Sequence, residues 1–427
     1  MSRRARRAGT LAVAASVLAG CTLVVGDGKY FIVSDAGSEA DSEATSADGG
    51  RDAPPSADEA GIVDSGPPGP CEAGARRCTG DGGIEACQAD GGWDFVAACS
   101  TGTCAAASCV GATVTAPSCA TPGPGRTNCG SDGGESCCLS EEIPGGTYYR
   151  TYDGGVSASP ATISPFRLDK YLVTVGRFRE FYTAWTSGET VDGGSGKHVH
   201  LNGGKGLANA AASGKYESGW SGGDDGNVAP NGANADLSCS PYGTWTQTPG
   251  AQENLPMNCL DWFQAYAFCI WDGGFLPSEA EMGYAAAGGG AQRAYPWGSA
   301  APGTANQYAI YGNGLGVCYY PSQANCAGVA NIAPVGTPPK GAGLWGQVDL
   351  GGEVNEWGLD WYSGSYVTPC TDCAYLNATG SRVLRGGAYK YGAFNFEWDS
   401  RFGFPVYSDA GKPQVSDLFG VRCARVP

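Results

Sequence analysis

The chain has 427 residues, a length that accommodates two or three domains. It carries 26 Lys and Arg against 42 Asp and Glu, and the net charge of −16 argues against electrostatic binding to nucleic acid or to an anionic membrane. Glycine contributes 70 residues, above the usual ~7%, but 11 Trp and 21 Tyr provide the material of a core. Composition therefore excludes a chain that is disordered or collagen-like throughout.

The first 20 residues have the layout of an export signal. Basic residues come first, and the apolar run that follows, Leu11–Leu18, is too short to span a membrane. The tetrad L-A-G-C, which ends at Cys21, resembles the bacterial lipobox, in which the cysteine is lipidated and becomes the first residue. We therefore expect residues 1–20 to be a lipoprotein signal peptide. An ordinary secretory signal with a coincidental cysteine is the alternative.

The segment after Cys21 predicts an anchor followed by a spacer. Acyl chains on Cys21 would hold the protein at a membrane. Thr22 follows, not Asp, and in diderm bacteria this pattern resembles that of outer-membrane lipoproteins, so the expected location is the cell envelope. Residues 27–68 carry ten acidic and two basic residues among Ser, Ala, Gly and Pro. Such a segment buries too little apolar surface to fold, so residues 21–69 are predicted to be a disordered tether.

The cysteines indicate disulfides and an oxidising compartment. There are 19, and the number that remains after Cys21 is even and spread over the whole chain. Six lie between residues 71 and 109, where large apolar side chains are scarce, so we expect a small disulfide-rich module over residues 70–140. The absence of C-x-x-C pairs and of histidine in that stretch argues against zinc. The sequence does not choose among the possible pairings, although adjacent Cys137 and Cys138 are expected to have different partners.

From residue 141 to the C-terminus the sequence predicts the main domain. A turn at 143–146 leads into a strand, and 166–174 predicts a strand followed by the start of a helix. Four aromatic residues recur at the spacing of one helix face: Phe178, Phe181, Tyr182 and Trp185. Two further helices are expected to open with capping boxes, Asp261 with Gln264 and Ser278 with Glu281. The segment 186–250, rich in Gly, Asn and Asp, is predicted to be irregular surface.

Seven motifs of the main domain, in order, resemble one family. They are Pro256–Trp262 (P-M-N-C-L-D-W), Gly274–Glu281 (G-F-L-P-S-E-A-E), Tyr295–Gly298 (Y-P-W-G), Pro334–Gly336 (P-V-G), Gly343–Trp345 with Asp349–Trp357 (G-L-W and D-L-G-G-E-V-N-E-W), Arg382–Gly387 (R-V-L-R-G-G) and Gly420–Cys423 (G-V-R-C). The family is that of the formylglycine-generating enzyme, or sulfatase-modifying factor. The resemblance implies an α+β fold, a variant of the C-type lectin fold with little regular secondary structure.

The resemblance also implies an oxidase that this sequence does not support. The family's enzyme converts a sulfatase cysteine to formylglycine with oxygen and copper, and two thiolates hold the copper. Soft thiolates suit Cu(I). Counting from Ala388 at the end of the R-G-G motif, the two thiol positions are Tyr391 and Phe396, and no cysteine occurs between Ala388 and Cys423. We therefore expect no copper and no catalytic residue at these positions.

Two other groups of residues are candidates to replace the missing thiols. Cys370 and Cys373 form a C-x-x-C pair, which can be a redox or metal pair but in an exported domain is more often a structural disulfide. Relatives such as the sulfoxide synthases hold iron with histidines, and this chain has only His198 and His200. The two form His-Val-His within a glycine-rich stretch, so a solvated loop is expected there instead of an iron site.

Calcium is the one cofactor that the resemblance leaves in place. Relatives bind it at the D-M-x-G-N-V loop, which maps onto Asp349, Leu350, Gly352 and Val354 and offers the oxygen ligands that calcium prefers. The family's N-V-W-E-W becomes E-V-N-E-W here, which changes the detail of the loop. A second family site would begin at Asn306, but its later Asp corresponds to Ala327, so that site is expected to be lost or altered.

The sequence thus predicts a lipid-anchored envelope protein, at the outer membrane, whose main domain is a non-catalytic binding or interaction module. Loop-carried aromatics motivate this prediction. The candidate partners are the membrane, through the N-terminal lipid, and a glycan, a peptide or another envelope protein, with no nucleic acid. An enzyme of the family with an altered active site, acting by oxygen-dependent oxidation or peptide modification, is the second hypothesis. A purely structural envelope component is the third.

Overall fold

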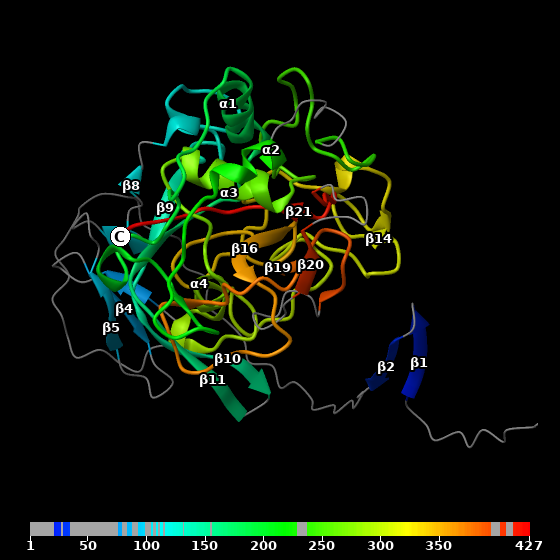
Figure 1. The fold of residues 1–427 in the computed structure, drawn as a ribbon. Helices are drawn as coiled ribbons and strands as arrows, with labels where there is room; N and C mark the ends of the chain where they lie inside the picture. The colour runs from blue at the N-terminus through cyan, green and yellow to red at the C-terminus, as the bar shows by residue number, and fades with distance from the viewer. Residues whose placement is uncertain are drawn as a thin grey trace, which may run out of the picture. The chain divides into compact units, whose positions relative to one another are not determined.

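The computed structural model describes residues 116–130, 132–153, 156–228, 237–393, 402–406 and 413–427, and the backbone of eight strands nearer the N-terminus. The chain divides into two units, residues 1–66 and 67–427, which are described separately (Figure 1). In the first, β1 (Cys21–Gly26) pairs antiparallel with β2 (Lys29–Ser34), both within the segment expected to be a tether. The predicted signal peptide, the Cys21 side chain and Phe396 lie outside the described residues. None of the described helices has the length and apolar character needed to cross a membrane.

The cysteine-rich segment contains short antiparallel strands. β3 (Arg76–Cys78), β4 (Gly83–Cys87) and β5 (Trp93–Ala98) form one sheet, and β6 (Cys104–Ala105) pairs with β7 (Ser108–Cys109). Their side chains lie outside the described residues. Further along, Cys119 bonds to Cys138 and Cys129 to Cys137, which confirms that the adjacent cysteines have different partners.

The described part of the main domain contains three larger sheets. One of them combines strands from its N-terminal and C-terminal ends. β8 (Ala112–Thr113), β9 (Leu139–Ile143), β12 (Phe166–Asp169) and the C-terminal β22 (Ala424–Arg425) form a four-stranded sheet in the order β22-β12-β9-β8. The second has the order β20-β19-β16-β21, with β16 Asn355–Trp361, β19 Ser381–Arg385, β20 Phe402–Pro405 and β21 Phe419–Gly420. The third has the order β10-β11-β17, with β10 Gly146–Asp153, β11 Val156–Ile163 and β17 Cys370–Thr371. Two small pairs complete the set: β13 (Ala208–Asn209) with β18 (Cys373–Ala374), and β14 (Val317–Cys318) with β15 (Ala324–Asn325).

The three longer helices begin where the sequence predicts. α1 (Val175–Thr186) is capped by the Thr174 hydroxyl, which accepts a hydrogen bond from the Arg177 N–H. α3 (Trp262–Trp271) and α4 (Glu279–Ala287) open with complete capping boxes at Asp261 and Ser278. The short α2 spans Asp225–Val228, and the 3₁₀ turns are η1 Pro117–Cys119, η2 Asn202–Gly204, η3 Gly222–Asp224, η4 Gly289–Ala291 and η5 Val329–Asn331. These helices and sheets confirm the α+β class.

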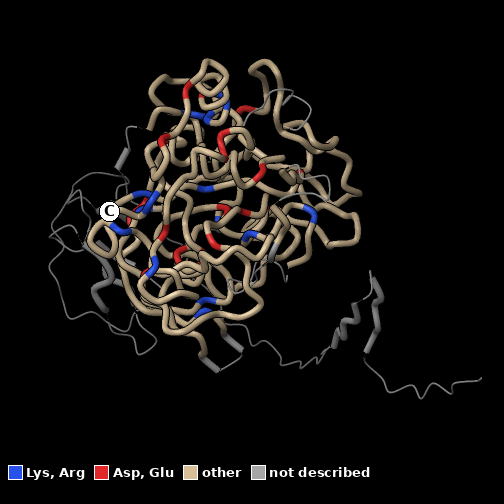
Figure 2. Tube along the Cα trace, in the orientation of Figure 1, with Lys and Arg blue, Asp and Glu red and all other residues tan. Residues whose placement is uncertain are grey.

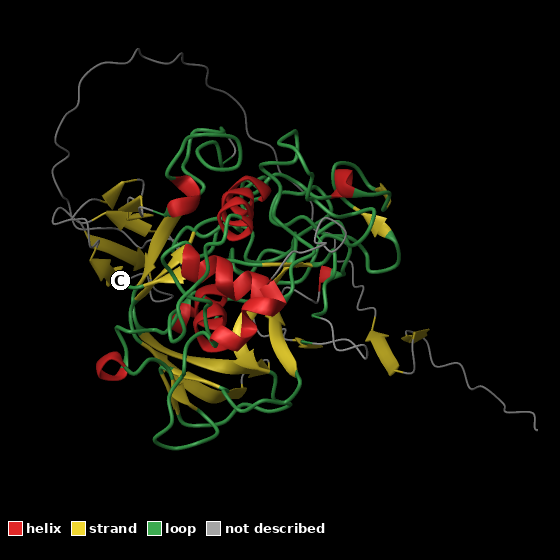
Figure 3. Cartoon of the chain, turned by 45° about the horizontal axis from the view of Figure 1, so that its top comes forward, coloured by secondary structure: helices red, strands yellow, loops and turns green. Residues whose placement is uncertain are grey.

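Long loops join these short elements (Figure 3), and they are not all surface. The prediction of irregular surface over 186–250 is wrong for several of its apolar residues, although Val199 is exposed. Leu201, Trp220 and Trp245 are buried in the largest core cluster, together with the aromatic rings of α1 and α3. The Phe178 ring, for example, stacks on Phe268 with centroids 5.8 Å apart. The glycine-rich composition reflects irregular backbone in this segment, not exposure.

Buried ion pairs hold the loops and elements together. Basic and acidic residues are interspersed throughout the second unit (Figure 2), and several pairs lie in its interior. The Arg177 guanidinium donates to Asp169 at 2.9 Å and to Asp272 at 2.6 Å, and all three side chains are fully buried. Arg425 of β22 binds the same two carboxylates at 3.0 and 2.8 Å. Ser118 joins them, since its N–H donates to Asp272 and its hydroxyl accepts from Arg177. Residues 116–119 therefore contact the interior of the main domain.

Replacement of Arg177 tests this network. Arg177→Met keeps most of the side-chain volume but leaves the two buried carboxylates with Arg425 alone, so we expect the free energy of unfolding to fall by about 3–5 kcal/mol. The control is Arg126→Met, because Arg126 pairs with Glu180 at a partly exposed site and should cost about 1 kcal/mol or less. Urea unfolding of the full chain measures both. Equal losses of unfolding free energy from the two substitutions would show that the buried network stabilises the fold no more than a partly exposed ion pair does.

Candidate functional site

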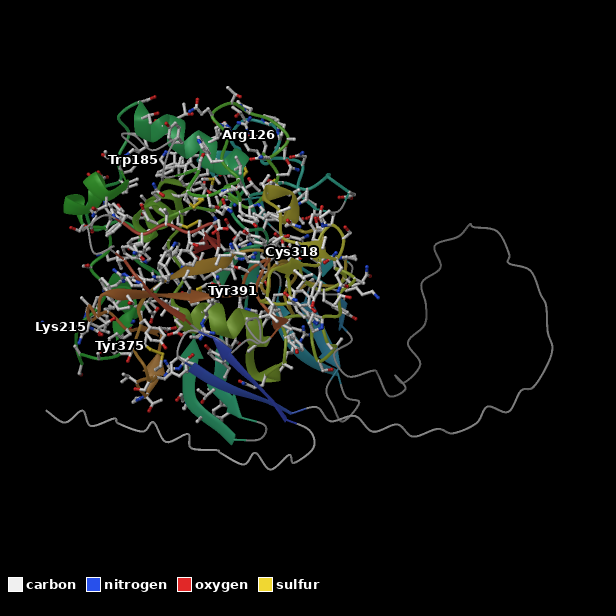
Figure 4. All side chains as sticks on the ribbon, turned by 90° about the vertical axis from the view of Figure 1, so that its right-hand side faces the viewer. Arg126, Trp185, Lys215, Cys318, Tyr375 and Tyr391 are labelled. Atoms are coloured by element: carbon white, nitrogen blue, oxygen red, sulfur yellow. A yellow bond between two sulfur atoms is a disulfide. The ribbon has the colours of Figure 1, made fainter. Side chains whose placement is uncertain are left out.

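Tyr391 stands where the sequence comparison with the family expects the first copper thiol. Its side chain is half-buried, its N–H donates to the Ala388 carbonyl at 2.9 Å, and its own carbonyl accepts from the Gly312 N–H at 3.0 Å (Figure 4). Burial, with a smaller contribution from the Asp417 carboxylate, raises the pKa of Tyr391. The hydroxyl is therefore a neutral phenol near pH 7 and does not offer the soft, anionic sulfur that Cu(I) prefers.

A cluster of polar side chains lies beside this position. The Tyr389 hydroxyl donates to Asp417 at 2.6 Å, and the Lys390 ammonium donates to the same carboxylate oxygen at 2.7 Å. The Lys390 nitrogen also lies 4.6 Å from the centre of the Tyr242 ring. Burial, together with the hydrogen bond to Asp417, raises the pKa of Tyr389. The cluster contains oxygen and nitrogen groups that already bind one another, and it does not fit copper.

The loop predicted to bind calcium carries buried oxygens without partners. Asp349 is buried; its Oδ2 accepts from the Gly336 N–H at 2.6 Å, while its Oδ1 has no hydrogen-bond partner. The same is true of Glu353 Oε1 and Asn355 Oδ1. Asp349 and Glu353 have φ values of 58° and 60°, so this backbone adopts a conformation that non-glycine residues rarely take. Strain and unsatisfied oxygens in one short loop indicate a built site.

The charge in this loop is compensated only in part, since Arg422 lowers the pKa of Asp349 by less than burial raises it. Burial raises the pKa of Asp349 to about 6. Burial, and then the neighbouring Asp349, raises the pKa of Glu353 well above its ordinary range. A bound dication would relieve both effects, so these residues fit calcium, a hard ion that takes oxygen ligands. No described group of three or more His, Cys, Asp or Glu side chains is placed to hold a metal, so backbone and amide oxygens would have to complete the site.

The remaining predicted positions of this loop lie around Asp349. Leu350 and Val354 are buried, and the Gly352 N–H donates to the Gly386 carbonyl at 2.7 Å, which ties the loop to the R-G-G motif. At the second family site, Asn306 Oδ1 is likewise buried without a partner. Ala327 supplies no side-chain oxygen there, and its N–H donates to Asn331.

His198 is buried, and the prediction of a solvated loop is wrong for it. Its side chain is fully enclosed, with Nδ1 3.1 Å from Glu217 and Nε2 3.0 Å from Glu281. Burial opposes a charge on the ring, but the carboxylates of Glu281 and Glu217 outweigh it and raise the pKa of His198 to about 10. The ring is therefore an imidazolium that donates to both carboxylates, and it has no lone pair for a metal. His200 is half-buried, and burial lowers its pKa.

Cys370 and Cys373 form a disulfide that joins β17 to β18. Both residues are buried, at 2% and 4% exposure. Between them, Asp372 accepts hydrogen bonds from the N–H and the hydroxyl of Ser164 at 2.7 and 2.8 Å. The pair is thus enclosed in the contact between two sheets.

Comparison with known proteins agrees with the motifs. Residues 139–427 match the family model described as the sulfatase-modifying factor enzyme 1-like domain. The chain belongs to this family. The formylglycine-generating enzyme of Streptomyces coelicolor is 30% identical over 287 residues, which cover 64% of this chain and 82% of that enzyme. The hercynine oxygenase of Mycolicibacterium smegmatis is 32% identical over 180 residues, covering 38% of this chain and 36% of that protein. Among solved structures, PvdO from Pseudomonas aeruginosa has 17% identity and a TM-score of 0.42, and the match covers 72% of this chain and all of PvdO.

Several of the residues that shape these sites were missed by the sequence reasoning. Glu353 and Asn355 were noted only as departures from the family motif, although a carboxylate in place of the family's Asn is itself a signal of altered charge. Asp417, which binds Lys390 and Tyr389, lies far along the chain and carries no motif. Glu217 and Glu281 could not be paired with His198 because three separate segments supply them.

The charge on His198 predicts a pH dependence of stability. The folded-state pKa of about 10 lies above the ordinary value of 6.5. The stabilisation from this ion network is therefore complete below about pH 6.5 and is lost as the pH rises through about 10. We expect His198→Gln to lower the free energy of unfolding by about 3–5 kcal/mol at pH 6, with a smaller difference at pH 10.

The measurement is thermal or urea unfolding of the wild type and the variant at pH 6, 7.5, 9 and 10. His200→Gln is the control, because burial lowers the pKa of that ring below its ordinary value of 6.5, so it has no charge to lose between pH 7.5 and 10. A wild-type-to-variant difference that stays constant from pH 6 to 10 would show that His198 is uncharged in the folded protein.

Proposed function

We propose that this chain is a non-catalytic binding module of the formylglycine-generating enzyme family, held at the cell envelope by a lipid on Cys21. The observation that carries the proposal is Tyr391, a half-buried and protonated phenol at the position of a copper thiolate. The described neighbours of Tyr391 supply no substitute. Lys390 and Tyr389 are already bound to Asp417, and the nearest C-x-x-C pair is an enclosed disulfide.

The loops support a binding role without copper chemistry. Buried ion pairs, disulfides and caps hold them in defined positions, and a rigid scaffold that presents loops is the usual basis of binding sites. Candidate partners remain a glycan, a peptide or another envelope protein. The acidic composition argues for an uncharged or cationic partner over an anionic one, because long-range repulsion slows the approach of anions.

We further propose that the Asp349 loop holds a structural calcium ion. Asp349 would contribute a carboxylate, and Glu353 and Asn355 would contribute the buried oxygens that lack partners. Backbone carbonyls of the loop, at Leu350, Gly352 and Val354, are the further candidates. The ion would neutralise two carboxylates whose pKa values burial raises, and so would fix the loop that precedes β16.

The absence of oxidase activity is tested directly. The exported chain is incubated with Cu(I), oxygen and a peptide that contains C-x-P-x-R, and aldehyde is measured by mass spectrometry. We expect no aldehyde above a reaction without protein, while the relative from Streptomyces coelicolor serves as the positive control. Aldehyde formation would overturn the non-catalytic proposal and favour an enzyme with an altered active site.

Calcium binding is tested by metal analysis and thermal unfolding. We expect the dialysed chain to retain calcium and a chelator to lower its stability by about 3 kcal/mol when the ion was present at roughly a hundred times its dissociation constant. Asp349→Ala and the nearly isosteric Glu353→Gln should weaken binding, whereas Asp192→Ala, at an exposed carboxylate, should not. If the chain contains no calcium and the chelator does not change its stability, calcium is removed from the proposal and the rest is unaffected.

A further inference from the structure

A second concave site lies at the other end of β16, away from Tyr391. It is a pocket of about 220 Å³ between the start of α3, the ends of β16 and β19 and the loop 209–219. Trp262, Trp361 and Arg382 form one wall, and Tyr216 and Glu217 form another. Figure 4 labels Lys215 and Tyr375, the chain neighbours of pocket residues, at one edge of the domain and well separated from Tyr391. The pocket is therefore distinct from the position of the missing thiols.

The positive charge in the wall is already compensated. The Arg382 guanidinium lies between two indoles, 3.7 Å from the ring centre of Trp262 and 3.7 Å from that of Trp361. It also donates to the Leu359 carbonyl at 2.5 Å. Burial raises the pKa of Asp224, and Arg382 opposes the rise, so that carboxylate lies within its field as well. Cation–π contacts on both faces leave Arg382 little to gain from an anionic ligand.

The negative charge in the wall is compensated too. Both carboxylate oxygens of Glu217 lie 3.1 Å from Nδ1 of His198, and Glu217 also accepts the His198 N–H. Glu217 is only 7% exposed. A cationic ligand would therefore have to displace the imidazolium of His198 from Glu217. His198 belongs to the same chain, so it binds Glu217 without the entropy loss of association that a free ligand incurs.

Besides these charges the pocket offers aromatic faces and polar groups, and the Lys205 ammonium lies 5.1 Å from the centre of the Tyr216 ring. Trp361 is half-buried, and Tyr216 is 36% exposed, so both rings are accessible. Asn209 and Ser218 also line the pocket. The Asn209 amide already binds Ala211, Leu376 and Asn377, and the Ser218 hydroxyl donates to the Gly219 carbonyl, so the second N–H of the Asn209 amide and the lone pairs of the Ser218 hydroxyl are left for a ligand. Aromatic faces that contact C–H groups, beside neutral donors and acceptors, match a sugar ring, which has an apolar face and a rim of hydroxyls.

The size of the pocket limits the ligand to one ring. A volume of 220 Å³ holds about seven water molecules at ~30 Å³ each and is below the roughly 300–1,000 Å³ of sites for larger organic ligands. We propose that this pocket binds a single neutral pyranose unit, free or within a glycan. The inference rests on the proposed binding function and names its ligand class.

The test is saturation-transfer NMR on the exported chain with four neutral probes: the methyl glycosides of glucose, mannose and galactose, and N-acetylglucosamine. We expect at least one to bind with a dissociation constant on the order of 1 mM, as suits a ligand of this size. Tyr216→Ala should weaken binding roughly threefold to tenfold through loss of ring contact. Trp361→Phe, which keeps an aromatic ring, should weaken it less. Tyr149→Ala is the matched control, since Tyr149 is 40% exposed on β10 and lies outside the pocket lining.

Glucuronate and glutamate are the charged probes. If either binds here more tightly than every neutral sugar, with the same sensitivity to Tyr216→Ala, the neutral-pyranose assignment is wrong. If no sugar binds, or if neither pocket substitution changes the dissociation constant, the inference fails as well. Neither result bears on the aldehyde assay, so failure of this inference is distinguishable from failure of the non-catalytic proposal.

Discussion

The pairing of Arg177 and Arg425 with Asp169 and Asp272 is the interaction on which the rest of the domain depends. It joins helix α1, strand β12, the end of α3 and the C-terminal strand at one fully buried point. Charges at such a point are costly to bury and are tolerated only when every partner is present. The network therefore demands that four distant segments arrive together, and it specifies a single arrangement of a chain that has little regular secondary structure.

Other buried ion pairs likewise join distant segments, and they lie close to the candidate functional sites. Arg422 donates to Glu356 and to the carbonyls of Asp169 and Lys170, so it ties the last motif to β16 and to the first sheet. His198 links Glu217 of the pocket to Glu281 of α4. In contrast, Asp349 and Glu353 form no ion pair in the described part of the chain, although Arg422 lowers the pKa of Asp349, and this difference is the basis for proposing an ion there.

Local sequence signals predicted the elements, and the family motifs predicted their class. Asp261 and Ser278 start helices because capping chemistry is local and depends on residues three positions apart. The burial of Leu201, Trp220 and Trp245 could not be predicted, since glycine-rich surroundings suggest a loop while the partners of these side chains lie far along the chain. The burial of His198 could not be predicted for the same reason. Tyr391 was found because a fixed spacing from the R-G-G motif places it, but the role of Asp417 beside it required the fold.

The disulfide between Cys269 and Cys423 spans 154 residues and lies next to the Arg177 network. β22, which follows it directly, pairs with β12 near the start of the domain. A chain synthesised from its N-terminus therefore delivers the last strand after everything it must pair with. Until that strand arrives, Asp169 and Asp272 lack one of their two cations and the first sheet lacks an edge. Closure of this core therefore waits for the last residues of the domain.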